Sequence, residues 1–287
     1  MPMRFTRRHL LAALPASPAL AADRWAPLRA AVAKAEADAG GRLGLAVLDS
    51  GSGARFQHRG AERFPLCSTF KLLLAARLLH GADRGEWALT DRLPVTAADM
   101  LQPAPLTGSR IGGTASLAEL AGAMVMQSDN PAANLGLKRV GGPAALTGWL
   151  RGLGDTTTRL DRYEPQMNNE VPDDPRDTTT PLSMLATSRR LLTGTDLSDA
   201  ARAQLAGWMA ASTTADTMLR AGLPPGWREA NKTGAGADRA RNIMAVITPP
   251  GRAPVFVAAY LFGKAADLEA RNAYFPPLAR ALVAALA

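Results

Sequence analysis

The 287-residue sequence contains few of the residues on which disulfides and metal sites depend. Cysteine occurs once, as Cys67, so no internal disulfide can form. Histidine occurs three times, as His9, His58 and His80, without a His-x-His or Cys/His cluster, which argues against a zinc hydrolase. We therefore expect an enzyme or binding protein that uses no metal and no other cofactor.

Features of nucleic-acid binding and of a serine triad are also missing. Aromatic residues make up 5% of the chain, and the basic residues behind its formal charge of +8 are scattered among acids. Without a basic run or an aromatic ladder, we expect no nucleic-acid partner. No serine lies in a G-x-S-x-G elbow, and neither histidine outside the leader lies near a triad signature.

The N-terminal segment has the features of an export signal. Three arginines (Arg4, Arg7 and Arg8) precede a short apolar stretch at 10–20, and residues 19–21 fit a small-x-small cleavage pattern. The adjacent arginine pair resembles a twin-arginine signal, and a general secretory leader is the alternative. No later segment has the length and apolarity of a membrane span. We therefore expect a periplasmic or secreted protein with no membrane contact after cleavage.

Strand patterns lie near both ends of the chain, and helical patterns fill the middle. Expected strands are at 43–48, 54–58, 227–233, 242–248 and 254–262, and expected helices include 25–38 and 68–80. The consecutive prolines Pro276-Pro277 should break or kink the last helix. The sequence thus predicts an α/β fold of the α+β kind, with an antiparallel sheet that is built from both termini and flanked by helices.

The same order predicts the domain organisation. Residues 1–22 form the signal peptide, and residues 23–60 with 210–287 form a discontinuous α/β domain. Residues 61–209 form an inserted all-helical domain, and its acidic, proline-containing segment 159–177 has the length of a functional loop. Within this domain Ser116 and Glu119 predict a capping box, and Asn130 a helix cap before Pro131. We expect the site at the domain interface.

A serine and a lysine three residues apart are the first chemical signal. Ser68 and Lys71 would lie one turn apart on the same helix face, where the lysine can assist removal of the serine proton. A solvated lysine beside a capping serine is the bland alternative. The chain holds 33 lysines and arginines, and only five of these are lysines. Because lysine can give up its proton and arginine cannot, the lysine in this motif favours a catalytic interpretation.

Two further short motifs supply polar groups. Ser128-Asp129-Asn130 offers a hydroxyl that can pass a proton to a leaving nitrogen and an amide that can hold a substrate amide. Lys232-Thr233-Gly234 ends an expected strand, where the glycine permits close approach of a ligand and the other two can bind a carboxylate. Each motif is weak alone, but the three together predict acyl transfer through a serine ester.

The long loop contributes a fourth element. Glu164 could act as a general base for water, with Asn168 helping to hold that water. Arg162 and Asp177 bracket the loop and could close it with a charge-assisted pair. By composition alone, a solvated acidic loop is the simpler interpretation.

With these motifs in the order in which the family has them, the chain resembles the class A serine β-lactamases. The loop sequence from Arg159 to Pro165 and from Arg176 to Pro181 is similar to the family's Ω-loop and carries most of the specificity. The resemblance implies hydrolysis of the β-lactam ring of penicillin- and cephalosporin-type antibiotics, and hence resistance. It implies a β-lactam as the small-molecule partner, and we expect a monomer.

The resemblance also implies a role for each motif residue. Ser68 would be the nucleophile, Lys71 and Glu164 the candidate bases for acylation, and Ser128 the proton relay to the lactam nitrogen. Glu164 with Asn168 would activate the hydrolytic water, and the Glu164–Pro165 bond would be cis. The oxyanion hole and the substrate contacts would come from the N–H groups of Ser68 and Ala235 and from Asn130, Lys232, Thr233, Gly234 and Arg241.

Some positions depart from the family's pattern. Pro103 stands where an aromatic wall residue is frequent, and Gly236 where disulfide-bearing carbapenem-hydrolysing members have a second cysteine. Gln166, Met167 and Asn169 replace the acidic, leucine and acidic residues that are usual there. A D,D-peptidase acting on peptidoglycan and a β-lactam sensor that stays acylated are the alternative functions. Glu164 distinguishes the first of them, because the peptidases lack this glutamate.

Overall fold

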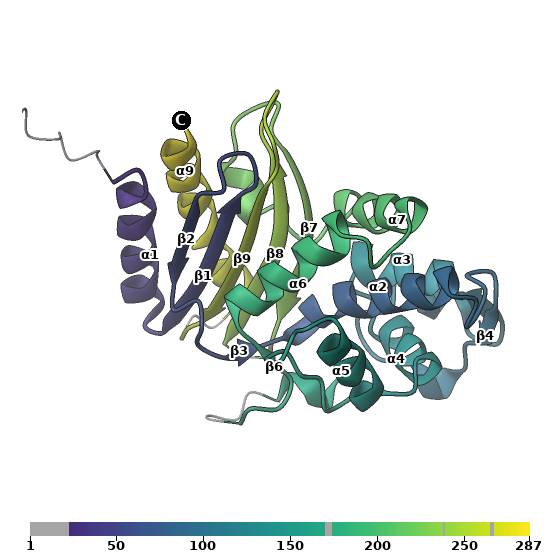
Figure 1. The fold of residues 1–287 in the computed structure, drawn as a ribbon. Coiled ribbons are helices and arrows are strands. Elements are labelled where there is room, and N and C mark those ends of the chain that lie inside the picture. Colours follow the sequence, from purple (N-terminus) through teal and green to yellow (C-terminus); the bar gives the residue numbers. More distant parts are fainter. Residues whose placement is uncertain (1–22, 170–173, 238, 265–266) are drawn as a thin grey trace, which may run out of the picture.

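A five-stranded antiparallel sheet is the core of one half of the molecule. Figure 1 shows this sheet in the computed structural model, with helices on both of its faces. The structure describes residues 23–169, 174–237, 239–264 and 267–287, so the expected leader lies outside the described residues. The strand order is β2-β1-β9-β8-β7, which places the two ends of the chain side by side in one sheet. The strands are β1 (Arg42–Asp49), β2 (Arg55–His58), β7 (Arg228–Ala235), β8 (Ala240–Thr248) and β9 (Val255–Phe262).

Alternation of side chains along these strands creates two separate cores. From β1, Leu43, Leu45 and Val47 enter the core shared with α1 (Ala26–Ala39) and α9 (Phe275–Leu286). From the other face, Ala46 and Leu48 join the core that contains the remaining large helices. The sheet is therefore buried on both faces, and its strands are apolar along most of their length.

Helices from the middle of the chain form the other half of the molecule (Figure 1). Helix α6 lies across the sheet face opposite α1 and α9, and α2 to α5 and α7 gather beyond it. These helices are α2 (Phe70–Asp83), α3 (Leu117–Met126), α4 (Asn130–Arg139), α5 (Pro143–Gly152), α6 (Pro181–Thr193) and α7 (Asp199–Ala210). Two short antiparallel pairs complete this half, namely β3 (Phe64–Pro65) with β6 (Thr178–Thr179) and β4 (Arg92–Pro94) with β5 (Thr114–Ser116).

The sequence-based expectations for the five strands of the sheet hold to within two residues, the expected interruption of the last helix is confirmed, and one helix cap differs. The last helix is divided into α8 (Leu268–Asn272) and α9, so Pro276 and Pro277 lie in the first turn of a new helix, where proline is tolerated. The predicted cap of α4 at Asn130 is wrong. Asp129 is the cap, because its carboxylate accepts a hydrogen bond from the Ala132 N–H.

The described part of the chain contains no helix that is long and apolar enough to cross a membrane. It also contains no group of three His, Cys, Asp or Glu side chains that could hold a metal ion. The division into an α/β domain and an inserted helical domain remains a prediction.

Candidate active site

The segment before α2 presents Ser68 at the junction between the sheet and the helices. Cys67, Ser68 and Thr69 form a single 3₁₀ turn that leads directly into α2. Cys67 has a φ of 43°, a left-handed value that is uncommon for a residue with a side chain. Lys71 lies in the first turn of α2, and its Nζ donates to Ser68 Oγ at 3.0 Å. The predicted serine–lysine pair is thus formed.

Lys71 lies at the centre of a buried polar cluster. Its Nζ donates to the Ser128 carbonyl oxygen at 2.9 Å and to Asn130 Oδ1, and it lies 3.3 Å from Glu164 Oε1. Both charged side chains of this ion pair are inaccessible to solvent. Burial lowers the pKa of Lys71, and the nearby Glu164 carboxylate partly opposes this shift. Lys71 can therefore exchange a proton more readily than an exposed lysine.

Glu164 is held by amide groups and is not a solvated loop residue. Its side chain is buried, and Asn168 Nδ2 donates to Oε2 at 2.5 Å. Asn134 fixes the backbone on both sides, because its Nδ2 donates to the Glu164 carbonyl at 2.9 Å and its Oδ1 accepts from the Glu164 N–H at 3.0 Å. Sequence reasoning missed Asn134, since it lies on α4 with no recognisable link to the loop.

The Ser128 hydroxyl lies between two lysines. Lys232 Nζ donates to Ser128 Oγ at 3.2 Å, and Lys71 Nζ approaches the same oxygen at 3.4 Å. Lys232 is fully buried, and its pKa lies well below the usual range because of burial and then the positive charges of Lys71 and Arg241. A hydroxyl held between two such groups can receive and deliver a proton.

Polar residues at the end of β7 surround a buried arginine. Thr233 Oγ1 donates to Thr214 Oγ1 at 2.7 Å, and the Arg241 guanidinium donates to the Thr214 carbonyl at 3.1 Å and to Asn272 Oδ1 at 2.6 Å. Burial lowers the pKa of Arg241 to about 10, which still leaves it cationic near neutrality. Thr214 and Asn272 were not predicted, because both lie in segments without a motif.

These groups open onto one cleft of about 780 Å³. Of the predicted residues, Lys71, Glu164 and Lys232 are buried around the cleft, and the others line it: Ser68, Ser128, Asn130, Asn168, Thr233, Gly234, Ala235 and Arg241. The structure thus brings every predicted site residue to one place. Pro103, Gln166, Asn169 and Gly236 also line this cleft, whereas Met167 is buried in the core.

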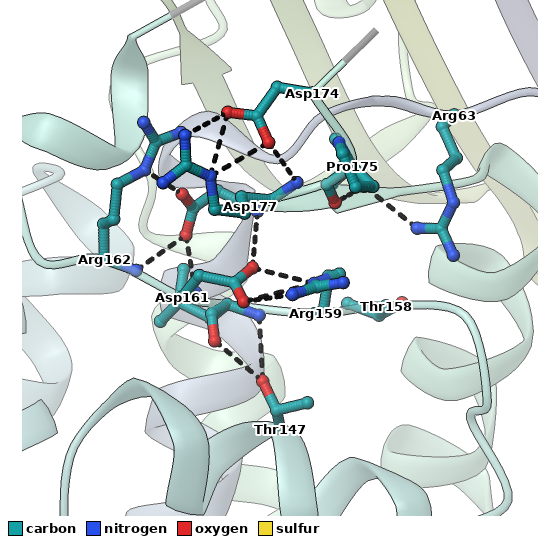
Figure 2. A network of polar contacts seen from close by, with 12 residues as sticks. Arg63, Thr147, Thr158, Arg159, Asp161, Arg162, Asp174, Pro175 and Asp177 are labelled. Carbon is teal, nitrogen blue, oxygen red and sulfur yellow. Dashed lines mark hydrogen bonds and ion pairs between the residues drawn. The ribbon is translucent and has the colours of Figure 1, made fainter.

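The two ends of the long loop are joined by a network of charged groups, which we call the loop neck: Arg159, Asp161, Arg162 and Asp177 (Figure 2). Asp177 accepts from the backbone N–H groups of Asp161 and Arg162 at 2.7 and 3.0 Å and from Arg162 Nε at 2.5 Å. Asp161 in turn accepts from the Asp177 N–H at 2.9 Å. The predicted Arg162–Asp177 pair is therefore present, and so is the cis Glu164–Pro165 bond.

Comparison with known proteins identifies the family. A family model described as the beta-lactamase enzyme family matches residues 27–286. The chain belongs to the class A β-lactamases. It is accordingly a hydrolase that opens the β-lactam ring of antibiotics and thereby confers resistance.

The similarity extends over most of the chain. The chain is 47% identical to beta-lactamase L2 of Stenotrophomonas maltophilia, over 80% of this chain and 77% of that one. It is 40% identical to beta-lactamase CTX-M-8 of Citrobacter amalonaticus, over 84% and 83% of the two chains. A solved beta-lactamase from Xanthomonas campestris has 48% identity and a TM-score of 0.90, covering 93% of this chain and all (100%) of its own.

Proposed function

We propose that this β-lactamase works through an ester on Ser68. Ser68 Oγ attacks the lactam carbonyl carbon, its proton passes to Lys71 or Glu164, and the ring C–N bond breaks. The Ser128 hydroxyl gives its proton to the departing nitrogen and regains one from the adjoining lysine. The hydrogen-bonded path from Ser68 through Lys71 to Ser128 supports this sequence of proton transfers.

The residues that line the cleft hold the substrate in this scheme. The N–H groups of Ser68 and Ala235 stabilise the negative charge on the carbonyl oxygen, as in an oxyanion hole. Thr233 and Arg241, with Lys232 behind them, bind the substrate carboxylate at the cationic end of the cleft. Asn130 and Gly234 border the side of the cleft along which the substrate amide lies.

Glu164 completes the reaction by activating the water that hydrolyses the ester. The observation that carries this step is the placement of its carboxylate, with Oε2 bound to Asn168 Nδ2 and Oε1 3.3 Å from Lys71 Nζ, next to the nucleophile. A base fixed by two neighbours beside the ester can take a proton from water without reorganising. A D,D-peptidase would not need this group, and we observe nothing that favours that alternative.

The decisive experiment compares the wild-type protein with Glu164→Gln. The wild type should hydrolyse a chromogenic cephalosporin with steady turnover. The variant keeps the hydrogen bond to Asn168 and cannot accept the proton, so we expect kcat to fall by about 10³-fold or more while an acyl-enzyme accumulates on Ser68. Intact-protein mass spectrometry detects this adduct. Steady turnover by the variant, without an adduct, would contradict the role of Glu164.

We also propose that the enzyme is exported, by the twin-arginine route, and that it acts as a monomer with the cleft between its two predicted domains. The arginine pair and the apolar stretch of the leader support export, although these residues lie outside the described part of the chain. All the side chains assigned to the site come from a single chain, which supports a functional monomer. Cell fractionation with an Arg7→Lys, Arg8→Lys leader and size-exclusion chromatography test the two points.

A further inference from the structure

Three residues from neighbouring strands form a cross-strand row directly beneath the nucleophile. Gly234 of β7 pairs with Asn242 of β8, and Asn242 pairs with Tyr260 of β9. All three are buried. The row faces residues 65–69, which we call the nucleophile turn. In the proposed mechanism Gly234 only borders the cleft beside the substrate amide, and Asn242 and Tyr260 have no role.

Asn242 holds the backbone of the nucleophile turn. Its Nδ2 donates to the Pro65 carbonyl at 2.8 Å and to the Leu66 carbonyl at 3.4 Å. The Leu66 carbonyl also accepts from Thr69 Oγ1 at 2.6 Å and from the Thr69 N–H at 3.2 Å. These bonds converge two residues before Ser68, so they determine where its N–H and hydroxyl point.

The other two members of the row act on the same segment. The Tyr260 hydroxyl lies 3.0 Å from Thr69 Oγ1, and its ring packs on Phe64 with the ring centres 6.1 Å apart. The backbone of Gly234 lies close against the nucleophile turn. A Cβ at this position would lie 3.1 Å from the Leu66 carbonyl oxygen and 3.2 Å from the Ser68 nitrogen, so a larger residue would displace the turn. The turn is thus confined between the strands.

This confinement matters because the nucleophile turn is strained. Cys67 has a left-handed φ of 43°, a conformation that persists only where the surroundings over-determine it. Relaxation of the backbone at Cys67 would move the Ser68 N–H and Oγ away from the position required for attack. A displacement of 1 Å at a reacting group can reduce a rate by about 100-fold.

Packing alone does not account for an asparagine at position 242. The Oδ1 atom of Asn242 has no hydrogen-bond partner within the described residues, and burying such a group is unfavourable. An apolar side chain at position 242 would avoid that cost. The next two residues of the strand, Ile243 and Met244, are apolar. The hydrogen bonds that Nδ2 donates to the Pro65 and Leu66 carbonyls therefore best explain why this residue carries an amide.

We propose that Asn242 is a positioning residue for the nucleophile: it clamps the carbonyls of Pro65 and Leu66 and so keeps Ser68 in its reactive orientation. This inference rests on the proposed role of Ser68. It concerns the acylation rate and not substrate affinity, because the Asn242 amide donates its hydrogen bonds to Pro65 and Leu66 and not to Thr233 or Arg241, which bind the substrate carboxylate.

The test measures single-turnover acylation in the Glu164→Gln protein, where the adduct accumulates. Asn242→Leu keeps the branching of the side chain at Cγ and removes the donor; leucine is larger than asparagine, and the Asn231→Leu control introduces the same increase in size. We expect the limiting acylation rate for a chromogenic cephalosporin to fall by about 10- to 100-fold, with the dissociation constant of the initial complex changed less than threefold. The inhibition constant of phenylboronic acid, which adds to the serine oxygen, should rise to a similar extent.

Asn231→Leu is the matched control. Asn231 is a fully buried asparagine on β7 whose Nδ2 donates to Glu229 Oε1 at 2.8 Å, and its Oδ1 also has no partner among the described residues. Its side-chain hydrogen bond to Glu229 does not involve the nucleophile turn. A purely structural role for buried asparagines predicts equal losses in both variants, whereas positioning predicts a loss only for Asn242→Leu.

Tyr260→Phe provides a second variant in case Asn242→Leu does not fold. It removes only the hydroxyl that meets Thr69, and we expect acylation to slow by about threefold to tenfold, since one hydrogen bond contributes about 1 kcal/mol. Unchanged acylation in both row variants, or equal losses in the Asn231 control, would overturn the inference. Unchanged hydrolysis by Ser68→Ala would instead overturn the proposed ester on Ser68, and the inference with it.

Discussion

The catalytic cluster and the loop neck both concentrate charge, but they do so in opposite ways. In the cluster, the ammonium groups of Lys71 and Lys232 are completely buried and share the Ser128 hydroxyl. In the neck, each carboxylate accepts from backbone N–H groups as well as from an arginine (Figure 2). Three of the four neck side chains lie closer to solvent, with exposed fractions of 37% for Arg159, 21% for Asp161 and 18% for Arg162, whereas Asp177 is buried.

This difference separates proton transfer from structural support. Burial lowers the pKa of both lysines, which prepares the cluster to move protons. In the neck, hydrogen bonds from Arg159 and from the Asp177 N–H lower the pKa of Asp161 despite its partial burial, so its charge is permanent. The neck uses this charge to close the loop that carries Glu164. The two regions are also connected, because the Asp177 carbonyl accepts from the Leu66 N–H at 2.8 Å, within the nucleophile turn.

Replacement of Lys71 tests most directly whether the catalytic cluster serves proton transfer. In Lys71→Arg the positive charge beside Glu164 remains, but the guanidinium cannot release a proton. If proton transfer is the purpose of the cluster, the acylation rate should fall by about 10²- to 10⁴-fold. Lys138→Arg is the control, since Lys138 forms a mostly exposed pair with Asp99 and its replacement should leave the rate unchanged. A loss of less than tenfold at Lys71 would assign the acylation base to Glu164.

Substitutions in the loop neck should lower the free energy of unfolding more clearly than they lower kcat. Asp177→Asn keeps an oxygen acceptor and tolerates the left-handed φ of 55°, but it removes the charge paired with Arg162. Loss of one partner from this largely buried pair should lower the free energy of unfolding by about 2 to 4 kcal/mol. The thermal midpoint should therefore fall by about 5 to 10 °C, and kcat by about tenfold, since Glu164 loses its support.

Asp38→Asn is the control for the neck. Asp38 pairs with Lys34 on the exposed surface of α1, where an ion pair contributes little. Differential scanning calorimetry should show no measurable shift for this variant. Equal shifts in both variants would mean that the neck is an ordinary surface ion pair.

A third buried ionisable group, Glu229, lies outside both the catalytic cluster and the loop neck and shows what burial alone does to a carboxyl group. Glu229 on β7 is buried, and this burial raises its pKa to about 7. The Arg220 guanidinium lies 3.9 Å from Oε1, and Oε2 has no partner within the described ranges. Between pH 4.5 and about 7 the folded protein holds a proton that the unfolded chain has released, so stability declines as the pH rises through this window.

Glu229→Gln should remove this pH dependence. At pH 8 the variant should be more stable than the wild type by about 3 kcal/mol, and at pH 3 the difference should disappear, because the wild-type carboxyl is then protonated in both states. Urea unfolding at the two pH values measures the effect. A stability difference that is the same at both values would show that Glu229 does not titrate in this window.

Much of the site was predictable because its chemistry is local in sequence. Ser68 and Lys71 lie three residues apart, where any helix brings them together. Lys232 and Thr233 are neighbours in one motif, so the strand that carries them brings both to the same end of the sheet. The residues that support these groups were not predictable. Asn134 binds Glu164 from 30 residues away, and Asn242 binds Pro65 from 177 residues away, with no pattern at either end.

The sequence by itself determined the five strands of the main sheet, most helix starts, the reacting groups and the charged pair that closes the loop, but not the two short strand pairs. Each of these depends on interactions between residues close in the chain or on residue types that only one chemistry uses. The tertiary structure decided which polar groups lose their water. Glu164 is a solvated acid by composition and a buried base in the fold, because α4 places Asn134 against its backbone. Desolvation, which shifts the pKa of both lysines, exists only once the sheet and the helices have packed together.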